Sequence, residues 1–290
     1  MLRGSLAASG CTVDATRAVA AVRSDVEVGL LEDGGRTVGF FPFQGGRRNV
    51  AGPVGGKMSD CQGAIVEKGV SWDPRQLLRG CGLRAWQFDH LIASQQPLRP
   101  YHYAAAPAPY VDLAQGWESY RAALVAAHKK TFKSIMRKLR RAERESGSVR
   151  LELQAADPDV FSTMVRWKSQ QYRRTGMTDA LAFDWTVRLL EQVLARRAED
   201  FSGMLSALYF GDTLSAVMLS MRSQHVLHAW FPAHGPDPAN LSPGLLLWME
   251  LLKACPALGI RRIDLGKGGE AYKDRLMSGA VDVAEGSVEL

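Results

Sequence analysis

The segment Asn-Leu-Ser-Pro-Gly at residues 240–244 precedes an apolar helix and has the composition of an anion-binding turn. Backbone N–H groups in the first turn of a helix have no partner inside the helix, and the helix dipole adds partial positive charge there. A phosphate or pyrophosphate group can accept hydrogen bonds from those N–H groups. The segment equally fits an ordinary helix start, with Ser242 as the N-cap and Pro243 in the first turn. The residues that would contact an anion are Leu241, Ser242, Pro243, Gly244 and Leu245.

Two other residues have side chains that can move a proton, and both lie on predicted strands. His228 occurs in Val-Leu-His-Ala-Trp-Phe, and a neutral imidazole can take a proton from an amine. A core histidine bonded to a backbone carbonyl would have the same sequence context. Asp264 occurs in Arg-Arg-Ile-Asp-Leu-Gly, on a strand that we expect to be central, where a buried carboxylate requires a partner. We take His228 and Asp264 as candidate catalytic residues.

Positive charge is concentrated in residues 129–144, which contain eight basic residues and one acidic residue. The whole chain has a formal net charge of +6, so the remainder is close to neutral, at −1. The segment predicts a helix with one apolar stripe, formed by Ile135, Met136, Leu139 and Ala142. Most of the basic residues fall on one flank of that helix, and Lys138 lies apart from them. We interpret the helix as structural first, with Arg137 and Arg141 on a flank that contacts an anionic ligand.

The first hundred residues read as strands and turns. Two apolar runs, Val26–Leu31 and Thr37–Phe43, surround Asp33-Gly34-Gly35, and glycines at this place favour a tight hairpin turn. Residues 97–109 contain four prolines and read as a connector. No helical segment is recognisable before the first of these runs.

The rest of the chain is mostly helical at first and then mixed. We predict a helix that ends at Gly147, because glycine readily adopts the left-handed conformation that ends helices. After it we predict the order strand, helix, helix, three antiparallel strands, helix, strand, helix. The domains expected from this pattern are an N-terminal half over residues 1–111, a helical connector over residues 112–147 and a C-terminal domain over residues 148–290.

That order of elements, with a turn able to bind phosphate after the third strand of the meander, resembles the GNAT acyltransferase fold. Six phrases carry a closer resemblance to the CelD-like acetyltransferases of bacterial cellulose and exopolysaccharide biosynthesis: SDCQG at residues 59–63, KSIMRKLRRAERESG at 133–147, WKSQQYRRTG at 167–176, GMLSALYFGDTLSAVMLSMRSQHVLHAWFPA at 203–233, SPGLLLWMELL at 242–252 and GIRRIDLGKGGEAYK at 259–273. The family is also similar to the FemAB-like acyltransferases. The resemblance implies an α/β (α+β) fold of tandem GNAT-like halves, of which the C-terminal half is the more complete.

The resemblance also implies site residues. The pyrophosphate of acetyl-CoA would rest on the turn at residues 241–245, although the usual GNAT consensus for that turn is absent here. Tyr272 stands where GNAT proteins often place the tyrosine that protonates the departing thiolate, and Glu270 and Lys273 belong to the same phrase. We expect Glu270 and Tyr272 to be catalytic and Lys273 to bind the cofactor. Three residues of the WKSQQY phrase are expected to line the acceptor site: Trp167, Gln171 and Tyr172.

Three functions compete on the sequence. The first is an acetyl-CoA-dependent acetyltransferase acting on a sugar, amino sugar or small amine in polysaccharide biosynthesis, without a metal. The second is a FemAB-like aminoacyl transferase that uses charged tRNA. The third is a degenerate GNAT scaffold that recruits partners to a polysaccharide synthase at the membrane. We expect no DNA partner under any of them.

Composition sets the remaining expectations. The chain has 290 residues, of which 46% are hydrophobic and 23% charged, as is normal for globular proteins. Its four cysteines are widely spaced, which predicts free buried thiols and no zinc site. The N-terminal residues lack the sustained apolar stretch of a signal peptide, so we expect a cytoplasmic protein.

Overall fold

The structure is a computed structural model, and it describes residues 13–198, 200–237 and 240–290. The chain forms two compact units. The first contains residues 1–109, 266–268 and 280–290, and the second contains residues 110–265 and 269–279. We predicted the first boundary near residue 111. In the structure the predicted connector, residues 112–147, belongs to the second unit, and the last eleven residues belong to the first.

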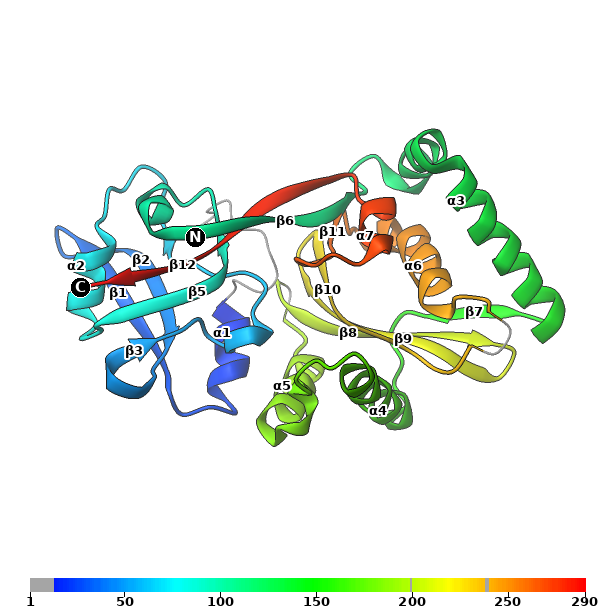
Figure 1. Cartoon of the computed structure of the whole chain (residues 1–290), viewed down its shortest axis with the longest axis horizontal. Coiled ribbons are helices and arrows are strands. Elements are labelled where there is room, and N and C mark those ends of the chain that lie inside the picture. Colours follow the sequence, from blue (N-terminus) through cyan, green and yellow to red (C-terminus); the bar gives the residue numbers. More distant parts are fainter. Residues whose placement is uncertain (1–12, 199, 238–239) are drawn as a thin grey trace. The chain divides into compact units, whose positions relative to one another are not determined.

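The first unit combines strands of different lengths with short helices (Figure 1). Its elements are α1 (Val13–Ala20), β1 (Val26–Asp33), β2 (Arg36–Gln44), β3 (Val50–Ala51), β4 (Ile65–Val66), α2 (Pro74–Gly80) and β5 (Ala85–Ile92), with most of β6 (His102–Asp112) and β12 (Gly279–Glu289). Strands β1, β2 and β4 form one sheet in that order, and β3, β5, β12 and β6 are hydrogen-bonded neighbours in another. Helix α1 shows that a helix does precede the first strand, contrary to our expectation.

The predicted hairpin in the first unit is confirmed. β1 and β2 pair antiparallel up to Asp33 opposite Arg36, so the loop consists of Gly34 and Gly35. Both glycines have positive φ, at 58° and 79°. A two-residue loop of this kind needs positive φ at both positions, which glycine adopts without steric cost.

The prediction of a proline-rich connector is wrong, because most of its residues, 102–109, belong to strand β6. Pro107 and Pro109 lie within the strand, and its last three residues, ending at Asp112, pair with β11. The two prolines are two residues apart, so both missing N–H donors belong to the same edge of the strand. The other edge keeps its donors, which is how a strand tolerates proline.

The second unit has the complete element order that the sequence predicts. Its elements are α3 (Gly116–Ser146), β7 (Val149–Glu152), α4 (Pro158–Arg174), α5 (Asp184–Ala195), β8 (Ser202–Phe210), β9 (Thr213–Ser223), β10 (Val226–His234), α6 (Pro243–Ala254), β11 (Arg262–Asp264) and α7 (Ala271–Leu276). The sheet runs β6, β11, β10, β9, β8, β7. The expected fold class, α/β with two GNAT-like halves of which the second is the more complete, is confirmed.

Helices cover both faces of this second sheet (Figure 1). Helices α4 and α5 pack against β8, β9 and β10 from one side. Helices α3 and α6 cover the other side, where the core contains Leu227, Ile263 and most of the apolar side of α6. Helix α3 has non-helical dihedrals at His128, so the basic segment begins just after a kink. The helix ends at Gly147 with φ 81°, as predicted.

The cysteines only partly follow expectation. Among the described residues Cys81 and Cys255 are free thiols, but Cys61 takes part in a disulfide, which the sequence did not predict. Within the described ranges, none of the helices combines the length and apolar character that a bilayer crossing requires.

Candidate active site

The middle of the second unit's sheet contains two parallel strands that part after three residues. The first three residues of β10, ending at His228, pair with the three residues of β11, which end at Asp264. Strand β10 continues to His234 and bulges at Trp230, where its register with β9 shifts. In open α/β sheets, ligands bind beyond the carboxyl ends of such strands. The residues that flank this end of β10 and β11 are therefore candidates for a ligand-binding site.

His228 and Asp264 are register partners on these two strands. Their neighbours Leu227 and Ile263 point into the core beside α6, so His228 and Asp264 point to the opposite face, the one covered by α4. His228 is only 5% exposed. The carboxylate of Asp264 is 2.6 Å from the guanidinium of Arg262. The structure thus places the two predicted residues together, but Asp264 is committed to an ion pair.

A cluster of three charged residues lies where α4 approaches the start of α7. Lys168 of α4 is 8% exposed and Lys273 of α7 is 4% exposed. Glu270, which precedes α7, forms an ion pair with Lys273 at 3.0 Å between its Oε2 and the lysine Nζ. Lys168 interacts electrostatically with both of them. We call Lys168, Glu270 and Lys273 the lysine cluster.

The lysine cluster brings two buried lysines beside the carboxylate of Glu270. Burial disfavours the charged form of Lys168, and this lowers its pKa from an ordinary value of 10.5 to about 8. Glu270 acts in the opposite direction and Lys273 adds to the lowering. A lysine with a pKa this close to neutrality is present in part as the free amine, which can accept a proton.

Lys168 is a candidate site residue that we did not select from the sequence, and the structure buries it. The buried residues Val160, Met164 and Lys168 follow one another at four-residue spacing along α4. That spacing was visible in the sequence and indicates one helix face, so it could have predicted the burial of Lys168.

The predicted acceptor-site residues surround Lys168 on the same helix. The Nζ of Lys168 donates to the Oε1 of Gln171 at 3.3 Å and lies 5.1 Å from the ring centre of Tyr172. Trp167 packs against Gly235, just after the end of β10, so closely that a Cβ on Gly235 would lie 2.7 Å from the indole. The structure therefore gathers Trp167, Gln171 and Tyr172 near the lysine cluster.

Tyr272 has a different environment from the one we expected. Its ring stacks on Trp248 of α6 at 5.7 Å and belongs to the core on that side of the sheet. Burial raises the pKa of Tyr272 well above its ordinary value, and Glu270 adds to the increase. These contacts give Tyr272 a packing role, and its role as an acid stays a prediction.

The predicted pyrophosphate turn is already occupied by a side chain of the protein. The two carboxylate oxygens of Asp237 accept hydrogen bonds from the backbone N–H groups of Leu241 and Ser242, both at 2.7 Å. The carbonyl of Ser242 accepts from the N–H of Leu245 at 2.9 Å, and Pro243 has no N–H. Of the five predicted residues, all described, only Gly244 keeps an N–H for an anion. The side chains of the other residues of the turn, Leu241, Pro243 and Leu245, are mostly buried in the core.

The basic helix reaches this turn through one residue. The Nζ of Lys138 donates to the hydroxyl of Ser242, although we had set Lys138 apart from the basic flank. Arg137 and Arg141 are exposed, and Arg141 forms an ion pair with Glu145 one turn further along the helix, at 2.7 Å. The structure therefore places Lys138 at the turn and leaves Arg137 and Arg141 on the exposed face.

These contacts test whether an acyl-CoA fits the turn. A pyrophosphate carries negative charge and needs several free N–H groups. Here an aspartate holds two of them and its carboxylate adds charge of the wrong sign. The pyrophosphate of acyl-CoA does not fit the turn in this conformation.

Comparison with known proteins identifies the family. A family model described as the acetyltransferase (GNAT) domain matches residues 129–274, which contain α4 to α6, β11 and the lysine cluster. No curated protein sequence matches the chain. Among solved structures, FemX is similar with a TM-score of 0.58 and 8% identity over 95% of this chain and 90% of FemX. The C-terminal domain of a putative lysylphosphatidylglycerol synthetase from Agrobacterium fabrum is similar with a TM-score of 0.57 and 13% identity, over 93% of this chain and 87% of that one.

The likenesses to solved structures concern the fold alone, and the family match reaches further. It covers half of the chain and includes every strand of the second unit's meander. GNAT proteins in general take acyl groups from acyl-CoA. The chain belongs to the acetyltransferase (GNAT) domain family and is a GNAT-type acyltransferase.

Proposed function

We propose that the protein transfers an activated acyl group to an amine, and that the lysine cluster performs this transfer. The observation that carries the proposal is the pair of buried lysines, Lys168 and Lys273, beside the carboxylate of Glu270. Burying two cations is costly, and structural needs alone rarely justify it. Perturbed ionisable groups of this kind concentrate at functional sites.

Each member of the lysine cluster has a chemical role in this proposal. The free amine of Lys168 takes a proton from the attacking amine as the new C–N bond forms. The ammonium of Lys273 stabilises the negative charge that develops on the acyl oxygen. When the tetrahedral intermediate collapses, the proton held by Lys168 passes to the leaving group, which departs neutral. Glu270 positions Lys273 through their ion pair.

The acceptor that we propose is an amine on a sugar, an amino sugar or a small molecule used in building an exopolysaccharide. The resemblance of six phrases to CelD-like acetyltransferases supports this choice. Trp167 and Tyr172 supply aromatic surface beside Lys168, and such surface suits the apolar face of a sugar ring. We further propose that the protein works in the cytoplasm, with a polysaccharide synthase at the membrane as its partner.

The donor is a separate question, and the geometry of the turn bears on it. Asp237 occupies the N–H groups that a CoA pyrophosphate would need. Beside the turn, Lys138 is followed by exposed cations on α3 that could contact a phosphate backbone. We therefore propose an aminoacyl group carried by tRNA as the donor, in the manner of the FemAB-like transferases. FemX, whose fold this chain shares over 95% of its length, supports that choice.

Acetyl-CoA is the second candidate donor, because the GNAT family as a whole uses acyl-CoA. It requires Asp237 to leave the turn. The experiment that separates the donors offers glucosamine as acceptor with either acetyl-CoA or alanyl-tRNA, and detects the acylated amine by mass spectrometry. We expect product from alanyl-tRNA. Product from neither donor, over a panel of sugar amines and small amines, would remove the proposed function.

Asp237 provides a matched prediction for CoA binding. We expect wild-type protein to bind CoA weakly, and the Asp237→Ala variant to bind it about tenfold more tightly, because removing the carboxylate frees two N–H groups and a negative charge. Calorimetry with CoA measures the change in affinity. Pantetheine, the arm of CoA without phosphate groups, is the control ligand, and its affinity should be the same for both proteins. Tight CoA binding by the wild type, unchanged in the variant, would show that the pyrophosphate lies elsewhere.

The basic flank gives a prediction that is specific for a nucleic-acid donor. Reversing the charge at Arg137 and Arg140, both exposed, should weaken tRNA binding. The plot of the logarithm of the binding constant against the logarithm of salt concentration should also become less steep, by about two units. The control is Arg188→Glu, since Arg188 is an exposed basic residue on α5, at the opposite face of the sheet. An unchanged salt slope would reduce the flank to a solvated helix face.

A further inference from the structure

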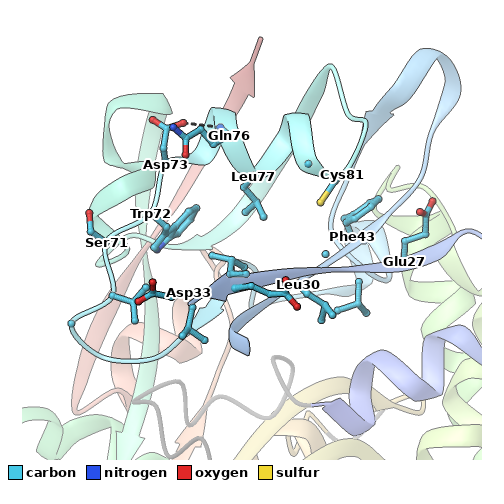
Figure 2. Close-up of a pocket in the computed structure, with 18 residues that line it drawn as sticks. Glu27, Leu30, Asp33, Phe43, Ser71, Trp72, Asp73, Gln76, Leu77 and Cys81 are labelled. Atoms are coloured by element: carbon cyan, nitrogen blue, oxygen red, sulfur yellow. Dashed lines mark hydrogen bonds between the residues drawn. The ribbon is translucent and has the colours of Figure 1, made fainter. Parts of the chain in front are cut away.

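The first unit contains a groove that the acyl-transfer chemistry does not use. Its volume is about 880 Å³, within the range of roughly 300–1,000 Å³ typical of ligand sites. It lies between strand β1 and helix α2 with the loop that leads into it (Figure 2). All seven residues from Glu27 to Asp33 line it. Successive residues of a strand point to opposite faces, so a groove that touches all of them must run along the strand edge.

Among the described residues, that edge of β1 has no strand beside it. Strand β1 is the outer strand of the sheet β1-β2-β4, and the described strands pair with it on one side only. Unpaired strand edges offer N–H and C=O groups to another extended chain. Val28 and Leu30 on this strand are 47% and 56% exposed, which is high for apolar residues on a strand. An added strand would cover both.

The opposite wall supplies apolar surface for alternate side chains of an added strand. Figure 2 shows Leu77 on α2 and Trp72 just before it, both between the helix and β1. The thiol of Cys81 lies against Gly29, so closely that a Cβ on Gly29 would be 2.5 Å from its Sγ. Backbone pairing on one side and apolar contacts on the other are the two parts of peptide recognition by strand addition.

Charge selects the kind of occupant. Four acidic residues line the groove, and among the described residues that line it none is a lysine or an arginine: Glu27, Glu32, Asp33 and Asp73. A second copy of the chain pairing through its own β1 would bring Glu27, Glu32 and Asp33 against the same three acids. Such like-charge contact opposes self-association and leaves a basic partner as the complementary one.

We propose that this groove binds an extended segment of a partner protein in which basic and apolar residues alternate. The segment adds to the edge of β1. Its apolar side chains lie on the α2 side, toward Trp72 and Leu77, and its basic side chains lie on the other side, over Val28 and Leu30 and next to Glu32. The site is independent of the lysine cluster, so it concerns recruitment of a partner and not acyl transfer.

Cys81 makes the proposal testable because it is a free thiol inside the groove. Burial raises the pKa of Cys81, with Glu27 adding to the increase, so alkylation is best followed under mildly alkaline conditions. The probe is a short peptide of alternating lysine and valine, and its control is the same peptide with glutamate in place of lysine. At a concentration ten times its Kd, the basic peptide should slow iodoacetamide labelling of Cys81 about tenfold, as read by peptide mapping.

Variants separate the groove from a general charge effect. The Glu32→Lys variant, in the groove, should lose the protection, whereas Asp282→Lys, an exposed acid of the same unit outside the groove, should keep it. Equal protection by the acidic peptide, or none by the basic one, would overturn the proposal. Protection that rises with protein concentration in the absence of peptide would assign the groove to a second copy instead, and would also overturn it.

Discussion

We expect the Lys273→Met variant to lose about 10²- to 10³-fold in kcat, with little change in KM for the acceptor amine. Removing one group that stabilises a developing oxyanion typically costs this much. The Nζ of Lys273 forms an ion pair with Glu270 at 3.0 Å, and this contact holds the lysine in place. Methionine keeps most of the side-chain volume at a site that is 4% exposed.

Two further variants distinguish a catalytic charge from a structural one. Lys273→Arg keeps the charge and should recover part of the activity. Glu270→Gln removes the ion pair and should lower kcat by less than Lys273→Met, because Glu270 only positions the lysine. The matched control is Lys68→Met, an exposed lysine of the first unit, which should leave the rate unchanged. If Lys273→Met folds normally and retains full activity, Lys273 has no role in the transfer.

The second large effect concerns Lys168. We expect Lys168→Met to be inactive or nearly so at neutral pH, yet more stable than the wild type. General base catalysis is worth about 10²- to 10⁴-fold, and methionine cannot accept the proton. In the wild type the folded state must accommodate a charge that burial disfavours. A pKa lowered from 10.5 to about 8 corresponds to a penalty of about 3 kcal/mol at pH 7.

The pH dependence of stability follows from the same shift. Between about pH 8 and about pH 10.5 the unfolded state binds more protons at Lys168 than the folded state does. The free energy of unfolding of the wild type should therefore rise across that window, relative to the variant. Tm measured against pH for both proteins gives this difference directly. Parallel Tm curves would mean that Lys168 has an ordinary pKa.

The sequence predicted the parts of the fold that depend on local signals. Gly34 and Gly35 predicted the hairpin loop because a two-residue loop requires positive φ, which glycine adopts without steric cost. Gly147 predicted the end of α3 for the same reason. The strand through Pro107 and Pro109 was missed, because local composition favours a connector and the strand is stabilised by pairing with β12 and β11, which are distant in sequence.

The candidate site was predicted less completely, for a physical reason. The family resemblance singles out the phrases that contain Gln171, Tyr172, Glu270 and Lys273, and the structure brings these four residues close to Lys168. The protonation of Lys168 depends on burial between α4 and α7, which only the tertiary structure determines. The bonds from Asp237 to the turn likewise depend on how the chain between β10 and α6 folds back.

The most direct test of the lysine cluster is the single-turnover rate of acyl transfer as a function of pH. For the wild type we predict a rate that rises with pH and levels off above about pH 8, because the free amine of Lys168 is the active form. For Lys168→Met we predict a rate that is at least about 10²-fold lower and lacks that rise. A variant that keeps the wild-type rate and the same rise near pH 8 would contradict the assignment of the active site.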